Sequence, residues 1–281
     1  MRNDRRIQWL LVTVAMVFMP AAGWPQTTPQ TDPHHLMAAG SGVNLGITQL
    51  LAEAFMRLHP ETTVEVPGSI GSRGAISAVA DGAITLGLIS RPLKSSEESP
   101  GLVTRPYART AIVVGVHPAV KEEEITLREL VDIYRGTKTR WKDASEIIVL
   151  AREPGDSGMQ VMEEKVPGFK EAYAESAREK RWTIFYTDQD ANRALATTRG
   201  AIGVSDLGMI SAERLDIKVL KLNGITPALE SLLDERYPLS RDLAFLYREG
   251  TLPEEARAFL DFVYSGEGGR ILRSSGYLPL R

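Results

Sequence analysis

Short apolar or β-branched segments alternate with amphipathic segments along most of this 281-residue chain. The predicted strands cover residues 63–66, 84–90, 111–116, 147–151, 201–204, 219–222 and 243–247. The predicted helices cover residues 47–58, 127–134, 191–198, 228–233, 254–264 and 269–272. Strand–helix alternation is typical of α/β proteins with largely parallel sheets. A chain of this length is about right for two modest α/β lobes rather than one small core.

Two apolar runs are the predicted connections between these lobes. Residues 109–118 form a long run that ends in His-Pro, and it is expected to carry the chain from the first lobe to the second. Residues 241–247 are expected to carry it back. The predicted first lobe is therefore discontinuous, with residues 36–114 and 240–281, and residues 115–239 form the second.

The first 26 residues have the order of a secretory signal peptide. Three arginines precede an apolar run over residues 7–19, and small residues and prolines follow it. We expect cleavage between Ala22 and Gln26; an uncleaved membrane anchor is the alternative. The chain contains no cysteine, so no lipid-modified cysteine is expected, and the prediction is a periplasmic protein that is not a lipoprotein.

The charge of the chain argues against nucleic acid or an anionic membrane as a partner. The first 26 residues hold three Arg and one Asp, so their removal lowers the formal net charge from −3 to −5. A negative chain has no general attraction for phosphate backbones or acidic lipids. Any anion must therefore be bound by local, directed groups.

Three segments share one pattern of Gly with Ser or Asn between a predicted strand and a predicted helix. They are residues 40–44 (GSGVN), 68–74 (GSIGSRG) and 152–158 (REPGDSG). The second precedes a short predicted helix at residues 75–80, and the third precedes a predicted helix through Met162. A helix N-terminus offers unpaired N–H groups and a partial positive charge, and glycine lets the backbone approach a ligand closely. The pattern predicts an anion cradle, whereas a helix cap with a tight turn is the alternative for any single segment.

Arg152 lies at a predicted strand end directly before the third segment. Its planar guanidinium is suited to binding an oxyanion with two parallel bonds, and a surface ion pair is the alternative. None of the three segments ends in the Gly-Lys-Ser/Thr of a phosphate-binding P-loop.

Metal and hydrolase sites have little support in the sequence. The four histidines, His34, His35, His59 and His117, have no metal-ligand spacing, so no metal and no cofactor are expected. Residues 155–158 (GDSG) match the nucleophile loop of chymotrypsin-like proteases, which makes a serine hydrolase with Ser157 a remote alternative. That fold is all-β, and a triad needs a base beside Ser157, so we predict no catalytic residue.

These segments together resemble the phosphate-binding proteins of ABC transporters, the PstS family, from about Met37 to Leu280. The opening residues 40–45, the loop 71–74 and the run 126–141 (TLRELVDIYRGTKTRW) are similar to family motifs. So are residues 147–158, 200–204, 237–241 (YPLSR) and the end of the chain, 262–280. Each motif is weak alone, but their order and spacing are specific.

The resemblance implies a two-lobed periplasmic binding protein fold of type II, with a mixed sheet flanked by helices in each lobe and the ligand in the cleft. It implies ligand contacts from Asn44, Leu45, Ser72 and Arg91 in the first lobe and from Arg152, Ser157, Gly158 and Met159 in the second. Asn44 stands in place of a hydroxyl residue and Met159 in place of Thr. One extra residue separates Arg152 from Ser157.

Position 91 bears on selectivity. Some family members have Ser-Asp where this chain has Ser90-Arg91, and such a carboxylate can accept the proton of phosphate and repel sulfate. Arginine cannot accept a proton. Two alternatives stay open: Asp156 points into the cleft and replaces the acceptor, or Asp156 is only a helix cap.

The expected function follows from this resemblance. The chain is expected to be a monomeric binding protein, not an enzyme, that captures inorganic phosphate and delivers it to the permease of an ABC importer in the inner membrane. The alternatives are another oxyanion, such as sulfate, molybdate, tungstate or a phosphonate, and a sensor or scavenger without a transporter.

Overall fold

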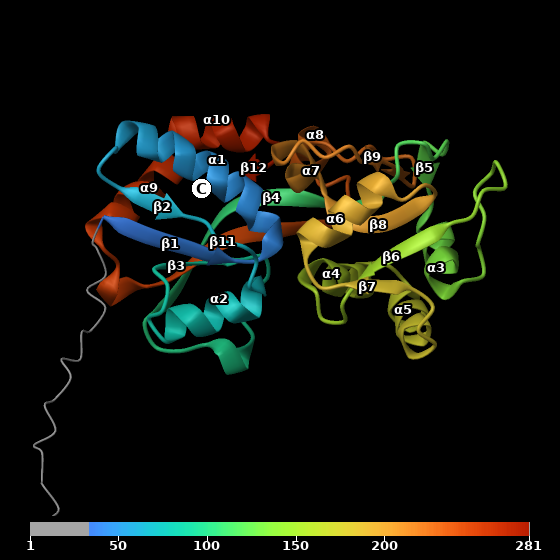
Figure 1. Ribbon diagram of the computed structural model, residues 1–281, viewed down its shortest axis with the longest axis horizontal. Helices are drawn as coiled ribbons and strands as arrows, with labels where there is room; N and C mark the ends of the chain where they lie inside the picture. The colour runs from blue at the N-terminus through green and yellow to red at the C-terminus, as the bar shows by residue number, and fades with distance from the viewer. Residues whose placement is uncertain (1–33, 281) are drawn as a thin grey trace, which may run out of the picture. The chain divides into compact units, whose positions relative to one another are not determined.

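The computed structural model describes residues 34–280, so the predicted signal peptide, residues 1–26, lies outside the described residues. The strands are β1 (His35–Gly40), β2 (Thr63–Glu65), β3 (Leu86–Ile89), β4 (Leu102–Val116), β5 (Glu124–Ile125), β6 (Ile148–Arg152), β7 (Thr183–Phe185), β8 (Ala201–Asp206), β9 (Lys218–Val219), β10 (Lys221–Leu222), β11 (Ser240–Arg248) and β12 (Leu278–Pro279). The α-helices are α1 (Gly42–Leu58), α2 (Gly71–Ala80), α3 (Leu127–Arg135), α4 (Ser157–Lys165), α5 (Phe169–Arg178), α6 (Asp188–Thr197), α7 (Leu207–Ala212), α8 (Leu229–Leu233), α9 (Glu254–Tyr264) and α10 (Gly266–Ser274). Figure 1 shows their arrangement.

The first half of the sheet is buried on both faces. Side chains of adjacent strand residues point to opposite faces, so Leu88 and Phe245 join one core while Ile89 and Ala244 join another. The first core packs against α1, α9 and α10, and the second packs against α2. Figure 1 shows these helices on opposite sides of β1 and β3. Burial on both faces explains why these strands read as continuous apolar runs.

Strand β4 passes from the first half of the sheet to the second. Its residues 102–111 pair antiparallel with β11, and its residues 112–116 pair antiparallel with β8. In the longer sheet the strand order is β2-β1-β3-β11-β4-β8-β6-β7. The long strands β4 and β11 therefore lie at the middle of the sheet, where the two halves meet (Figure 1).

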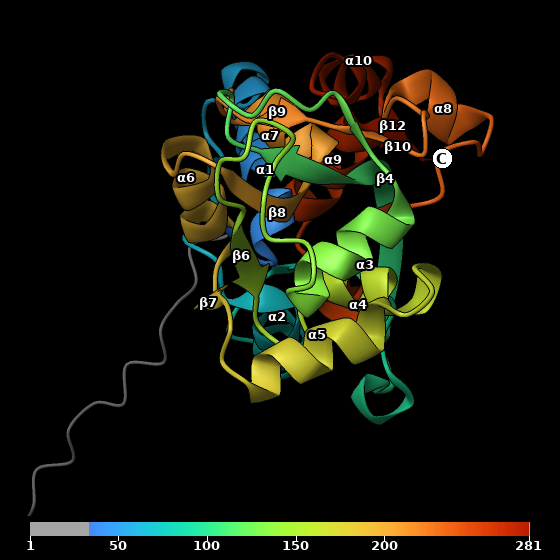
Figure 2. The same ribbon diagram turned by 90° about the vertical axis from the view of Figure 1, so that its right-hand side faces the viewer.

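The second half has its own core. Apolar residues of β6 and β8 pack with α3, α4 and α5, and the aromatic rings of Tyr134 and Phe169 lie 4.7 Å apart within it. Helix α3 begins with a capping box between Thr126 and Glu129 and ends at Gly136, whose positive φ ends the helix. Helices α3 and α5 lie side by side in this core (Figure 2).

The pairing of strands differs from the largely parallel sheet that the alternation predicts. Parallel pairs do occur at β1–β2, β1–β3, β6–β7 and β6–β8. The pairs β3–β11, β11–β4 and β4–β8 are antiparallel. The reason is that one long strand leads the chain across to the second half and the other returns, so these neighbouring strands run in opposite directions.

Two helices begin earlier than predicted. Helix α1 begins at Gly42 rather than at residue 47, and α2 begins at Gly71 rather than at residue 75. The glycines that the sequence analysis assigned to loops therefore form the first turns of these helices. Within residues 34–280, no helix combines the length and the apolarity that a membrane crossing needs.

Candidate functional site

The N-terminal ends of three helices line a cavity of about 380 Å³. Ser41 and Gly42 of α1, Gly71 and Ser72 of α2, and Ser157 of α4 all contribute to its wall. Helices α1 and α2 belong to the first half of the sheet, and α4 belongs to the second. The three predicted Gly/Ser segments are therefore brought together around one space, as an anion cradle requires.

The first turns of α1 and α2 carry no side-chain cap. Ser41 is the N-cap of α1 and Ile70 is the N-cap of α2, and neither side chain accepts a hydrogen bond from its helix. Helix N-caps usually satisfy one of the unpaired N–H groups with a side-chain oxygen. In α2, Gly71 N–H donates to Ser69 Oγ at 3.3 Å. The remaining N–H groups of these first turns and their partial positive charge are suited to an anionic ligand.

Helix α4 is capped by Asp156. Its Oδ1 accepts from the backbone N–H groups of Gly158 and Met159, at N–O distances of 3.0 and 3.1 Å. Its Oδ2 accepts from Arg152 Nη2 at 3.1 Å. Asp156 also lines the cavity, so it is both a cap and a wall residue. Three donors of the protein therefore use three of its about four acceptor positions.

Four serine hydroxyls meet at the base of this site. Ser90 Oγ lies 2.8 Å from Ser41 Oγ and 2.8 Å from Ser157 Oγ, and Ser72 Oγ is 3.5 Å away. Ser90 N–H also donates to Ser72 Oγ at 3.3 Å. The hydroxyl contact between Ser90 and Ser157 joins the two halves of the molecule directly.

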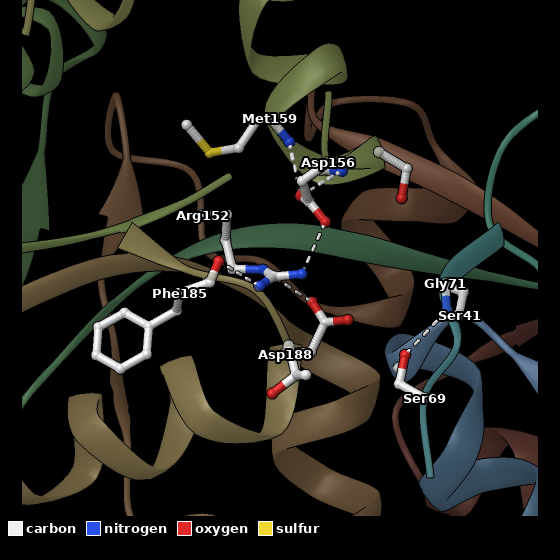
Figure 3. A network of polar contacts seen from close by, with 12 residues as sticks. Ser41, Ser69, Gly71, Arg152, Asp156, Met159, Phe185 and Asp188 are labelled. Carbon is white, nitrogen blue, oxygen red and sulfur yellow. Dashed lines mark hydrogen bonds and ion pairs between the residues drawn. The ribbon is translucent and has the colours of Figure 1, made fainter. Parts of the chain in front are cut away.

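Arg152 lies between two carboxylates. Nη1 donates to the backbone oxygen of Phe185 at 2.7 Å, Nη2 donates to Asp156, and Nε is 3.5 Å from Asp188 Oδ1. Figure 3 shows this arrangement, with Ser41, Ser69 and Gly71 on the other side of the space. Arg152 lines the cavity, but its guanidinium is already held by protein groups; its predicted two-bond contact with an oxyanion stays a prediction.

Asp188 is a functional candidate that the sequence analysis missed. It is the first residue of α6, it lines the cavity, and its side chain is 14% exposed. Burial raises the pKa of its carboxyl, and the nearby Asp156 carboxylate raises it further, whereas Arg152 and Arg241 oppose this shift. Aspartate is common at the start of an amphipathic helix, where it interacts with the helix dipole. The sequence therefore gave no specific indication that Asp188 belongs to the site.

The guanidinium of Arg91 is already bound by acceptors of the protein. Nη1 and Nη2 donate to the two carboxylate oxygens of Glu97, both at 2.7 Å, and Nη1 also donates to Pro92 O. The hydrogen bond from Arg91 lowers the pKa of Glu97 to about 2. Arg91 lines the cavity, and its predicted contact with the ligand stays a prediction.

The remaining predicted site residues lie behind the cavity wall. Asn44 is fully buried in the first turns of α1, where Nδ2 donates to Tyr107 Oη at 3.1 Å, and Leu45 packs in the first core. Met159 packs in the second core, and Gly158 N–H is bonded to Asp156. Because α1 begins at Gly42, the residues nearest the cavity are Ser41 and Gly42 rather than Asn44 and Leu45.

Arg241 is the second functional candidate that the sequence analysis missed. It lies on β11, and its guanidinium forms a buried ion pair with both carboxylate oxygens of Asp206. Its Nη1 also donates to Ser157 Oγ at 2.7 Å. The motif at residues 237–241 was the available signal, but it did not indicate a contact with the third loop.

Metal binding and hydrolysis find no support at this site. Residues 34–280 contain no cluster of three or more His, Asp or Glu side chains with a metal-binding arrangement. Ser157 Oγ contacts Ser90 Oγ and Arg241 Nη1, and an arginine cannot act as the general base of a triad.

The comparisons with known proteins decide the family. Residues 25–267 match the family described as a PBP superfamily domain. The chain belongs to the PBP superfamily. The phosphate-binding protein PstS of Bacillus subtilis is 25% identical to this PBP-superfamily chain over 299 aligned residues, which cover all of this chain and 95% of that protein.

Solved structures of this superfamily agree with the fold. A Clostridium perfringens chain, named as a phosphate ABC transporter substrate-binding protein with bound phosphate, matches with a TM-score of 0.77 and 25% identity over 88% of this chain and all of that one. An ABC-type phosphate transport receptor from Vibrio cholerae matches with a TM-score of 0.62 and 22% identity over 86% and 99%. The predicted family resemblance and the two-lobed α/β fold are confirmed, and a binding protein rather than an enzyme is in keeping with the family.

Proposed function

We propose that this chain captures inorganic phosphate in the 380 Å³ cavity and delivers it to the permease of an ABC importer. The observation that carries the proposal is the convergence of three helix N-termini from both halves of the molecule on one cavity, two of them without a side-chain cap. The Bacillus subtilis and Clostridium perfringens relatives, both named for phosphate, support the same ligand.

The mechanism is closure of two lobes on the anion. The proposed lobes are residues 36–114 with 240–281, and residues 115–239, and β4 and β11 connect them. An anion that accepts hydrogen bonds from both lobes binds the closed state better than the open state and shifts the population toward closure. Burying an anion is unfavourable unless hydrogen bonds and positive charge compensate, and the helix N-termini, hydroxyls and Arg152 are placed to supply both.

Selectivity for phosphate is proposed to come from Asp188. Phosphate near neutral pH keeps at least one proton and needs an acceptor for it, whereas sulfate has none. Arg91 cannot accept, and Asp156 already accepts from three donors. The Asp188 carboxylate lies 3.5 Å from Arg152 Nε, and it faces the same cavity.

A calorimetric screen of the purified protein tests the proposal. Phosphate, sulfate, molybdate and a phosphonate are titrated separately at low and at moderate salt. We expect 1:1 binding of phosphate and much weaker binding of sulfate. Equal binding of all four anions would reduce the assignment to a general oxyanion binder, and binding of none would reject it.

The compartment and the partner are part of the same proposal. We propose that residues 1–26 are removed on export and that the mature protein acts as a free monomer in the periplasm, without a lipid anchor. The intact mass of the exported protein should correspond to a start near residues 23–27. A full-length mass in the membrane fraction would contradict this part of the proposal.

A further inference from the structure

A continuous line of hydrogen bonds runs from Arg241 on β11 into the cavity. Arg241 Nη1 contacts Ser157 Oγ at 2.7 Å, Ser157 Oγ contacts Ser90 Oγ at 2.8 Å, and Ser90 Oγ contacts Ser41 Oγ at 2.8 Å. All four residues are buried. Arg241 and Ser90 do not line the cavity, whereas Ser157 and Ser41 do.

The chemistry of arginine sets one end of this line. A guanidinium has only donors, so Ser157 Oγ must accept from Arg241. The pair with Asp206 raises the pKa of Arg241 in spite of its burial, so the group stays charged at any working pH. The positive guanidinium of Arg241 favours one orientation of the neighbouring hydroxyl groups, in which the oxygen faces Arg241 and the hydrogen points away from it.

The same direction then passes along the hydroxyls. A hydroxyl that accepts a charge-assisted hydrogen bond becomes a stronger donor, and hydrogen bonds that run in one direction reinforce one another. Ser157 therefore donates to Ser90, and Ser90 donates to Ser41. Ser41 Oγ then accepts from Ser90, so its own hydrogen remains for a group in the cavity.

We propose that Arg241 is a positioning residue that acts through Ser157 and Ser90 to make Ser41 a hydrogen-bond donor to the bound oxyanion. This inference rests on the proposed function of the cavity. Asp206 holds the guanidinium in place through Nε, at 2.9 Å, and through Nη2. Arg241 lies on β11 and Ser157 on α4, so the line also connects the strand that joins the lobes to the ligand site.

A double-mutant cycle tests this route. The dissociation constant for inorganic phosphate is measured by calorimetry for wild type, Ser41→Ala, Arg241→Met and the double variant. We expect each single change to weaken binding about tenfold, because a hydrogen bond to a charged group is lost. The dissociation constant of the double variant should exceed that of the single variant that binds less tightly by no more than about twofold. The reason is that both changes remove the same donor.

Breaking the line in the middle gives an independent measurement. In a Ser90→Ala background, Arg241→Met should change the dissociation constant less than about twofold. Arg241→Met leaves Asp206 buried without its partner and is the variant at risk of not folding. Ser157→Ala leaves that ion pair intact, and its effect should likewise disappear when it is combined with Ser41→Ala.

Arg109→Met is the matched control. Arg109 of β4 forms an ion pair with Asp242, which follows Arg241 on β11, with Nε 2.6 Å from Oδ1. This pair does not contact the hydroxyl line, so its loss should change phosphate affinity less than about twofold, alone or with Ser41→Ala. An effect as large as that of Arg241→Met would show that any ion pair on these strands matters, and would overturn the proposal.

The remaining outcomes separate this inference from the proposed function. Multiplicative penalties in the Ser41/Arg241 or Ser41/Ser157 cycle, or an Arg241 effect that persists in Ser90→Ala, would overturn the inference alone. A strong Ser157→Ala effect with a silent Ser41→Ala would mean that Ser157 is the terminal donor, which also overturns it. A wild-type protein that does not bind phosphate would overturn the proposed function, and the inference with it.

Discussion

Asp188 of α6 lies against Gly42 of α1, so closely that a Cβ atom added to the glycine would be 2.4 Å from Asp188 Oδ2. Gln189 Nε2 donates to Gly42 O at 3.1 Å in the same contact. The two helices come from different halves of the molecule, and both begin at the cavity. Glycine at this position lets the two helix ends approach, because an added Cβ would have to displace the side chains of Asp188 and Gln189.

Gly42→Ala should weaken phosphate binding more than tenfold, since the lobes can no longer reach the contact that closes the cavity. The fold itself should not lose stability, because alanine favours a helix over glycine by roughly 0.5–1 kcal/mol. Calorimetry and thermal melting measure the two effects. Gly266→Ala is the control: it is the first residue of α10, and an added Cβ would have no neighbour within 4 Å. Unchanged affinity in Gly42→Ala would contradict the role of this contact.

Asp188→Asn should reduce the preference for phosphate over sulfate by about tenfold or more, because the amide can donate to a sulfate oxygen that the carboxylate repels. Competition titrations with the two anions give the ratio directly. Asp190→Asn, on the exposed side of the same helix, should leave the ratio unchanged. If Asp188→Asn kept the wild-type ratio, another group would have to accept the phosphate proton.

Asp188 should also lower the stability of the unliganded protein at neutral pH. Its pKa is raised by burial and by Asp156, so the folded state binds the proton more tightly than the unfolded chain. Proton binding by Asp188 therefore contributes fully to folding stability below the pKa of the unfolded chain, about 3.9. This contribution is lost as the pH rises through the higher pKa of the folded state. Asp188→Asn should therefore melt higher than wild type at pH 7, and the difference should shrink toward pH 4. A lower melting temperature for the variant at pH 7 would show that its pairing with Arg152 outweighs burial.

Arg91→Ala should lower stability without removing phosphate binding. Glu97 has its pKa lowered to about 2 by Arg91, so the pair stabilises the protein above the ordinary carboxyl value of 4.5, and this is lost as the pH falls toward 2. Both side chains are less than a third exposed, and we expect a loss of about 1 kcal/mol at pH 7. Urea unfolding at pH 7 and pH 3 measures it, and Glu97→Gln should behave alike. A collapse of phosphate affinity in Arg91→Ala alone would assign Arg91 to the ligand.

The sequence predicted the fold class and placed three Gly/Ser segments at helix starts, because both depend on local pattern. Loop segments with Gly and Ser before helices are visible in a window of a few residues. The exact helix starts were wrong at Gly42 and Gly71, because glycine disfavours a helix interior yet is accepted in a first turn that faces a ligand. Asn44 and Leu45 came from the family resemblance rather than from a predicted helix start, and their contact with the ligand stays a prediction.

Helix α5 was missed although its signal was present. Its buried residues Phe169, Ala172, Tyr173 and Ser176 follow helical spacing, but lysines and glutamates between them hide the apolar face in a simple reading. The site contacts of Arg241 and Asp188 were missed for a different reason. Arg241 pairs with Asp206 and Ser157, 35 and 84 residues away, and only the tertiary fold brings them together.

The central claim is that helix N-termini from both lobes hold the oxyanion, and a crystal structure of the phosphate complex tests it most directly. We predict one phosphate in the cavity, with its oxygens within about 3.2 Å of backbone N–H groups in the first turns of α1 and α2 and of groups at the start of α4. Ser41 Oγ should be among the donors. A phosphate bound outside this cavity, or one that contacts a single lobe only, would contradict the account.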